Sequence, residues 1–178
     1  ILDGEFIFLP KYNKYLYMCF DCLILGDTNV RDESSLMKRL EISDELIYAI
    51  NQTGYKYNYT KDSKLDFNNS QKVIEWHTKN ITEFYDDIDK EINSKKSNVI
   101  VRRKYFIEAN GISDNEIFKY SSLMWNLYTT GKVKCPYLLD GLIYQPLDQK
   151  YVAEVEKTKY LELFRKCFYL VMLVKLFC

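Results

Sequence analysis

The first 25 residues contain two runs, 1–9 and 15–25, that fit a period of two and flank a short turn at 10–14. A period of two is typical of β-strands, in which successive side chains point to opposite faces of a sheet. The sequence therefore predicts a β-hairpin at the start of the chain, and any fold of this chain must accommodate a sheet there.

The first predicted strand carries Asp3 and Glu5 on one face, and Phe6 and Phe8 on the other. Neighbouring carboxylates repel each other and lose hydration when buried, so they need a cation, a hydrogen-bond donor or water. A solvated outer face is the general interpretation of such a pair. A second acidic turn far downstream, Asp140-Gly141, favours a shared site instead.

The composition is that of a globular protein, because 47% of the 178 residues are hydrophobic and 28% are charged. This length suffices for one domain with a hydrophobic core. The chain has 25 basic and 25 acidic residues. The zero net charge argues against a strong general attraction to nucleic acid, although it leaves room for a local basic groove.

The five cysteines are an odd number, and no signal-peptide pattern is found, which together favour a reducing, intracellular setting. Cys19-x-x-Cys22 has the spacing of half a zinc site. Residues three apart on a strand point to opposite faces, however, and no second such pair follows. The run 167–178 is almost entirely apolar but too short to span a bilayer, so we expect a buried strand or helix there.

Apolar side chains recur at every third or fourth position in three stretches, which predicts three helices. They are expected at 34–50, with a break near Ser43, at 71–92, and from a capping box at 113–116 to residue 129, with Gly131 ending the last. His77 lies on the apolar stripe of the second helix, so a packed histidine is a better interpretation than a catalytic one.

Further strands are predicted at 98–108, 138–147 and 151–155. Strands at both ends of the chain with helices between them indicate one α+β domain, built of largely antiparallel sheets with inserted helices.

The predicted strand at 98–108 carries a basic run, Arg102, Arg103 and Lys104, followed by Tyr105. These side chains are candidate RNA contacts, since they could touch phosphates and stack on a base. The alternative is an edge strand whose arginines extend their charged ends into water.

Three short motifs stand in order on predicted strands: Leu2-Asp3-Gly4-Glu5, Phe20-Asp21 and Asp140-Gly141-Leu142-Ile143-Tyr144. The set resembles the covalent nucleotidyltransferases, which comprise mRNA-capping guanylyltransferases and ATP- or NAD-dependent polynucleotide ligases. The longer strings at 2–7 and 139–146 most resemble capping guanylyltransferases of large DNA viruses. The resemblance implies part of the ATP-grasp-like ligase and capping-enzyme core over residues 1–163, followed by a divergent apolar tail at 164–178.

The resemblance also implies a role for each motif. Glu5 would contact the ribose or a metal-bound water, Phe20 would stack on the nucleobase, and Asp140 would bind the metal. Asp3 and Asp21 would brace the site through hydrogen bonds. The expected site residues are Glu5, Phe20, Asp21, Lys157 and Lys159 for the nucleotide, Asp140 and Glu5 for the metal, and Asp3, Gly4 and Gly141 for structural support.

The implied activity is transfer of GMP from GTP, through a lysyl-GMP intermediate, to the 5′-diphosphate end of RNA. Mg²⁺ or Mn²⁺ is the implied cofactor, because it would neutralise the phosphates and the pyrophosphate leaving group. The implied partners are GTP, the RNA 5′ end, and either the remainder of the same enzyme or a cap methyltransferase, with no membrane. We expect an intracellular location, in a viral factory of the host cytoplasm, or in the virion.

Two features depart from the family pattern. The family's nucleophilic lysine lies in a Lys-x-Asp-Gly motif before Leu-Asp-Gly-Glu, and this sequence, which begins at Ile1, contains no such motif. We therefore expect that this chain alone does not form a covalent nucleotide adduct. The family also places a phosphate-binding Lys-x-Lys after its second Asp-Gly strand, and Lys157-Thr158-Lys159 has this spacing but comes early in the chain.

Two other interpretations stay open. One is a fragment of an ATP-dependent polynucleotide ligase, which nucleotide choice would separate from a capping enzyme. The other is a non-catalytic viral binding or scaffold protein with the same fold, whose role would survive replacement of Glu5 or Asp140 by alanine.

Overall fold

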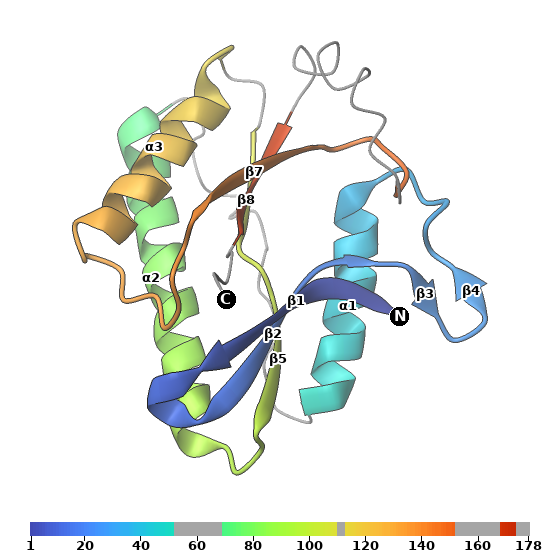
Figure 1. Ribbon diagram of the computed structural model, residues 1–178. Helices are drawn as coiled ribbons and strands as arrows, with labels where there is room; N and C mark the ends of the chain where they lie inside the picture. Colours follow the sequence, from blue (N-terminus) through green and yellow to red (C-terminus); the bar gives the residue numbers. More distant parts are fainter. Residues whose placement is uncertain (52–68, 110–112, 152–167, 174–178) are drawn as a thin grey trace.

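The computed structural model describes residues 1–51, 69–109, 113–151 and 168–173 (Figure 1). The elements in chain order are β1 (Leu2–Leu9), the 3-10 turn η1 (Pro10–Tyr12), β2 (Lys14–Cys22), β3 (Ile24–Leu25), β4 (Thr28–Asn29), α1 (Leu36–Asn51), α2 (Ser70–Ser94), β5 (Val99–Arg103), β6 (Phe106–Glu108), α3 (Glu116–Thr129), β7 (Gly141–Pro146) and β8 (Phe168–Leu173). The expected strand at 151–155 falls almost entirely outside the described residues.

The strands form a three-stranded sheet in the order β1-β2-β5, a short pair β3-β4, and a second three-stranded sheet in the order β6-β8-β7. Every strand pair is antiparallel except β2 with β5, which is parallel. The expected α+β class, with antiparallel pairing dominant, is therefore confirmed for the described part of the chain. β8, from the apolar tail, lies between β6 and β7, so this part of the tail is paired into the same sheet as the second Asp-Gly motif.

The predicted hairpin is present, and its register contains one irregularity. Asp3 pairs with Asp21 and Gly4 with Cys19, which leaves Phe20 as an extra residue on β2. Such a β-bulge re-aims the side chain that it contains. Glycine is required at position 4, because an added Cβ would lie 2.6 Å from the Tyr17 ring and 2.8 Å from the Met18 carbonyl oxygen.

The acidic face of β1 is the inward face. Ile7 and Leu9, which continue the alternation of Glu5, belong to the hydrophobic core, whereas Phe6 is 51% exposed. A solvated outer face for the carboxylates is therefore wrong. The sequence could not decide between the faces, because both carry large apolar side chains.

The predicted strand at 98–108 is two strands that belong to different sheets. β5 ends at Arg103 and β6 begins at Phe106, with Lys104 and Tyr105 between them. The Lys104 N–H donates to the Cys19 carbonyl at 2.7 Å, the last backbone bond before the chain leaves the first sheet. Lys104 therefore lies where the chain crosses between the two sheets. One continuous strand over 98–108 would contain no such crossing.

The helices differ from the predictions in two details. α1 continues through Ser43, whose hydroxyl donates to the Leu40 carbonyl at 2.7 Å instead of breaking the helix. The predicted capping box is not at the start of α3, because the N-cap of this helix is Asn115, which makes no side-chain cap hydrogen bond, and the Glu116 N–H donates to the Ser113 carbonyl at 3.1 Å. The Glu116 carboxylate accepts from the Tyr120 hydroxyl at 2.7 Å instead. Gly131 follows the end of α3 with a positive φ of 68°, as expected of a helix-ending glycine.

The main core lies between the sheets and the α2–α3 pair. Figure 1 shows α2 and α3 together on one side of the strands and α1 on the other. The predicted apolar stripe of α2 is buried, and it includes His77, which contacts the ring of Tyr120. Burial lowers the pKa of His77 to about 4, with Glu116 opposing the shift, so this residue is a neutral packed histidine. No helix within the described ranges is both long and apolar enough to cross a membrane.

Candidate active site

Four side chains from distant segments converge where the chain crosses between the sheets. The Lys104 Nζ lies 2.5 Å from Glu5 Oε2 and 5.7 Å from the centroid of the Phe20 ring. Asp140, which directly precedes β7, acts electrostatically on the same ammonium group. The structure thus brings together Glu5, Phe20 and Asp140, one residue from each sequence motif, around a lysine that the motifs did not include.

Lys104 is the most buried member of this cluster. Its side chain is 1% exposed, whereas that of Glu5 is 21% exposed. Burial lowers the pKa of Lys104, and the carboxylates of Glu5 and Asp140 oppose that shift. The result is a desolvated cation beside an accessible carboxylate, and a ligand that carries negative charge or acceptor oxygens could bind this cation strongly.

The sequence predicts Arg102, Arg103 and Lys104 together as RNA contacts, and in the structure each pairs with a different carboxylate. Arg102 is buried and pairs through Nε with Glu91, and Arg103 is buried and places Nη1 3.2 Å from Asp44 Oδ2. Arg102 and Arg103 are thus turned inward onto carboxylates and do not lie on the protein surface, whereas Lys104 pairs with the more exposed Glu5 of the candidate site. Arg102 and Arg103 therefore do not extend their charged ends into water as the edge-strand interpretation expects, and an RNA contact by the basic run stays a prediction.

Asp21 is held by another buried ion pair, with Arg39 of α1. Arg39 Nε donates to Asp21 Oδ1 at 2.8 Å and Nη2 to Oδ2 at 3.1 Å. Burial raises the pKa of Asp21, and the Arg39 guanidinium opposes that shift. Arg39 was not predicted, although a basic residue on the helix that follows Phe20-Asp21 is a signal that could have indicated it.

Asp3 is held by Tyr151, which lies 148 residues away in the chain. The Tyr151 hydroxyl donates to Asp3 Oδ2 at 2.6 Å, and this bond raises the pKa of Tyr151 to about 12. Asp3 and Asp21 therefore both accept the hydrogen bonds that a bracing role requires.

A pocket of about 170 Å³ adjoins Phe20 between β2, α1 and β7. It is lined by Phe20, Asp21, Leu36, Arg39, Ile143, Tyr144, Gln145, Pro146, Gln149, Lys150 and Tyr151. Gln145 Oε1 is buried and finds no hydrogen-bond partner among the described residues, so the pocket wall retains an acceptor. Phe20 and Ile143 give the pocket two apolar walls, and Ile143 belongs to the third sequence motif although it was not among the predicted site residues.

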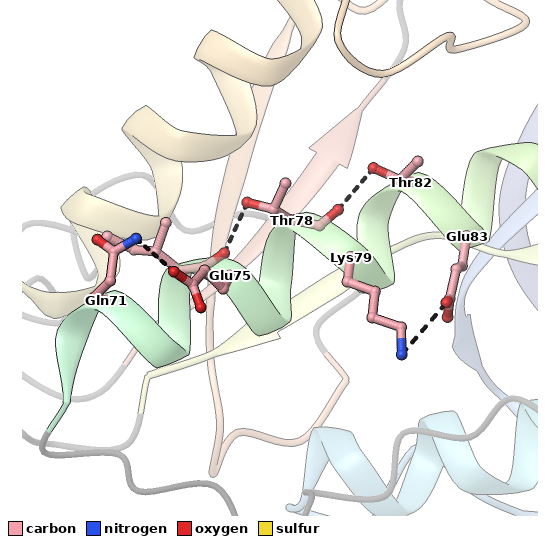
Figure 2. Close-up of a pocket in the computed structure, with 7 residues that line it drawn as sticks. Gln71, Glu75, Thr78, Lys79, Thr82 and Glu83 are labelled. Carbon is pink, nitrogen blue, oxygen red and sulfur yellow. Dashed lines mark hydrogen bonds and ion pairs between the residues drawn. The ribbon is translucent and has the colours of Figure 1, made fainter.

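Another hollow, of about 540 Å³, lies along the outer face of α2 (Figure 2). Its side chains bond to one another along the helix: Gln71 to Glu75 at 2.8 Å and Lys79 to Glu83 at 3.8 Å, while Thr78 and Thr82 bond to carbonyls one turn earlier. None of the motif residues contributes to it, so it is not part of the candidate site.

The donor set suits a metal only in part. No group of three or more metal-ligating side chains occurs within residues 1–51, 69–109, 113–151 and 168–173. Asp140 is exposed and Glu5 is engaged by Lys104. Mg²⁺ in nucleotide sites is commonly held by one or two carboxylates together with the phosphates. These residues therefore fit a metal that arrives with a nucleotide, with Asp140 as the available protein ligand.

Three other residues were expected at the site: Lys157, Lys159 and Gly141. Lys157 and Lys159 lie outside the described residues. Gly141 has nothing within 4 Å of the position that a Cβ would take, so packing does not require glycine there.

Comparison with protein-family models found no match, and comparison with solved structures found none either. Comparison with curated proteins found a "Probable mRNA-capping enzyme" of Acanthamoeba polyphaga mimivirus, 28% identical over 156 residues. The match covers 85% of this chain but 13% of that protein, so the chain spans a small part of its relative's length. Over most of its own length the chain is thus similar to part of a mimivirus probable mRNA-capping enzyme, which confirms the capping-enzyme resemblance that the motifs indicate.

Proposed function

We propose that this chain forms the nucleotide-binding part of an mRNA guanylyltransferase and has the nucleotidyltransferase core fold. The observation that carries the proposal is the convergence of Glu5, Phe20 and Asp140 on Lys104. The similarity to part of a viral capping enzyme supports the same reaction class.

In this proposal GTP binds with its base against Phe20. An aromatic face contributes about 1–3 kcal/mol per stacked base, by analogy with single-stranded nucleic acids. Ile143 supplies a second apolar wall of the adjoining pocket. Lys104 donates to acceptor oxygens of the nucleotide, and Glu5 accepts from the ribose hydroxyls on the more exposed side of the Lys104–Glu5 pair.

The chemical step is attack of a lysine amine on the α-phosphate of GTP, which forms lysyl-GMP and releases pyrophosphate. Transfer of GMP to the 5′-diphosphate end of RNA follows. Mg²⁺ or Mn²⁺, when bound, would lower the charge of the phosphates and of the leaving group. Asp140 is the residue that we assign to hold it, and Lys157 and Lys159 are assigned to the phosphates.

The nucleophile is proposed to come from a Lys-x-Asp-Gly motif outside the given sequence, which contains none. Lys104 is not assigned this role for two reasons. Its ammonium is already paired with Glu5, and the residues that follow it in the sequence are Tyr105-Phe106-Ile107, which do not match the x-Asp-Gly of the motif. Either another stretch of a longer protein or a second chain would supply the motif.

The proposal is tested by covalent labelling. The chain, with and without its native upstream coding sequence, is incubated with Mg²⁺ and α-labelled GTP or ATP and separated on a denaturing gel. We expect an acid-labile adduct with GTP only when the upstream segment is present, and its loss in the Asp140→Ala variant.

Other labelling outcomes identify the competing interpretations. An ATP-specific adduct would assign the chain to the ligases. A folded protein that forms no adduct with either nucleotide would be better explained as a binding or scaffold protein, and an adduct on this chain alone would contradict the assigned origin of the nucleophile.

A further inference from the structure

One buried side chain joins three segments around the Phe20 pocket. The Arg39 guanidinium donates twice to Asp21 on β2, to the Glu33 carbonyl before α1 at 2.6 Å, and to the Gln149 carbonyl beyond β7 at 2.8 Å. Arg39 is 3% exposed. A two-point grip on a planar carboxylate fixes orientation as well as distance.

Stability alone is a weak explanation for this arrangement. A buried ion pair loses hydration free energy on both partners, and well-packed apolar residues often stabilise a fold equally well. The pair also lies in the wall of the pocket that Phe20 lines, not in the main core between α2 and the sheets.

The bulge makes the anchor specific to Phe20. Phe20 is the extra residue on β2 and has no partner on β1, so strand pairing does not set the direction of its ring. Asp21 is its immediate neighbour and resumes the register opposite Asp3. Fixing the Asp21 carboxylate therefore fixes the backbone from which the Phe20 ring projects.

We propose that Arg39 is a positioning residue that aligns the Phe20 ring against a purine base by gripping Asp21, and that ties this alignment to the segment beyond β7 through Gln149. The inference rests on the proposed nucleotide site and assigns a role within it to a residue outside the three motifs.

The test separates binding of the base from binding of the phosphates. Affinities of the full 178-residue chain for GTP and for inorganic tripolyphosphate, each with Mg²⁺, are measured by calorimetry. In Arg39→Lys we expect GTP affinity to fall about tenfold, within the range of a lost base stack, and tripolyphosphate affinity to stay within about twofold. Lys38→Met, which removes an exposed charge from the same helix, is the matched control and should change neither affinity.

A double-mutant cycle distinguishes positioning from a general structural role. Phe20→Ala removes the stacking ring, so adding Arg39→Lys to it should cause no further loss of GTP affinity. Equal loss of GTP and tripolyphosphate, an unchanged GTP affinity in Arg39→Lys, or fully additive losses would each overturn the assignment of Arg39.

Two further outcomes are decisive. If the unsubstituted chain binds GTP no more tightly than tripolyphosphate, the proposed nucleotide site fails and this inference fails with it. If Arg39→Lys does not fold, the same cycle is run with Asp21→Asn, which leaves the Arg39 bonds to both carbonyls in place. A base-selective loss of about threefold, absent in the Phe20→Ala background, is expected there, and any other pattern overturns the inference.

Discussion

Arg102 and Lys104 are two residues apart in the same basic run, yet their ion pairs serve different parts of the molecule. Arg102 and Glu91 are both almost fully buried and join β5 to α2. Lys104 is equally buried, but its partner Glu5 is 21% exposed and lies beside Phe20, with Asp140 nearby. The first pair is closed to ligands, whereas the second keeps a face that a ligand could approach. The neighbouring motif residues, and not the exposure of the partner alone, mark the second pair as the candidate site, because the Asp44 partner of Arg103 is 24% exposed as well.

The closed pair should give the largest effect on stability. Arg102→Met leaves the buried Glu91 carboxylate with Lys95 as its remaining cation, and we expect the free energy of unfolding to fall by about 3 kcal/mol, the lower end of the range for a broken buried pair. Urea unfolding measures the change. Lys90→Met, which removes an exposed pair with Asp87 on the same helix, is the control and should change little. A loss below about 1 kcal/mol would show that the two pairs do not differ as described.

The free energy of unfolding should also depend on pH because of His77, which lies on α2, the same helix as Glu91. Its folded-state pKa of about 4 lies below the ordinary value of about 6.5, so the unfolded chain binds a proton more readily. Stability is therefore fully present above pH 6.5 and is lost as the pH falls towards 4, by up to about 3 kcal/mol. Unfolding curves between pH 7 and 4 measure this. The difference between the parent chain and His77→Gln should shrink as the pH falls; a constant difference would contradict the lowered pKa.

The open pair should give a smaller loss of stability and a larger loss of ligand binding. In Lys104→Met the Glu5 carboxylate can recover water, so we expect unfolding free energy to fall by about 1–3 kcal/mol. GTP affinity should fall by about tenfold or more if Lys104 contacts the nucleotide. Unfolding and calorimetry on the same preparation check both. Normal GTP affinity in a folded Lys104→Met variant would remove Lys104 from the site.

The smallest effect on stability should come from Asp140. Its side chain is exposed, so Asp140→Asn should change the free energy of unfolding by no more than about 0.5 kcal/mol. The Mg²⁺-dependent increase in GTP affinity should nevertheless be lost. Titrations with and without Mg²⁺ measure it, and an unchanged Mg²⁺ dependence would place the metal elsewhere.

Local patterns predicted the elements that pack by a regular period. The buried stripe of α2, including His77, follows from its spacing, and the β1–β2 hairpin from its alternation. The patterns failed where a local rule competed with a tertiary contact. The run at 98–108 reads as one strand, but it divides at Lys104 because the chain passes between two sheets. The capping box predicted at 113–116 was also wrong, since α3 begins only at Glu116 and its N-cap is Asn115, which makes no side-chain cap hydrogen bond.

The sequence by itself determined the hairpin, the periodic helices and the three motifs that carry the capping-enzyme resemblance, because each depends on residues close together in the chain. Only the tertiary structure decided that Lys104 joins Glu5, 99 residues away, and that Arg39 joins Asp21 and Gln149. The physical reason is that a buried charge takes whichever opposite charge the fold brings within a few ångströms, and that distance is set by how the sheets and helices pack.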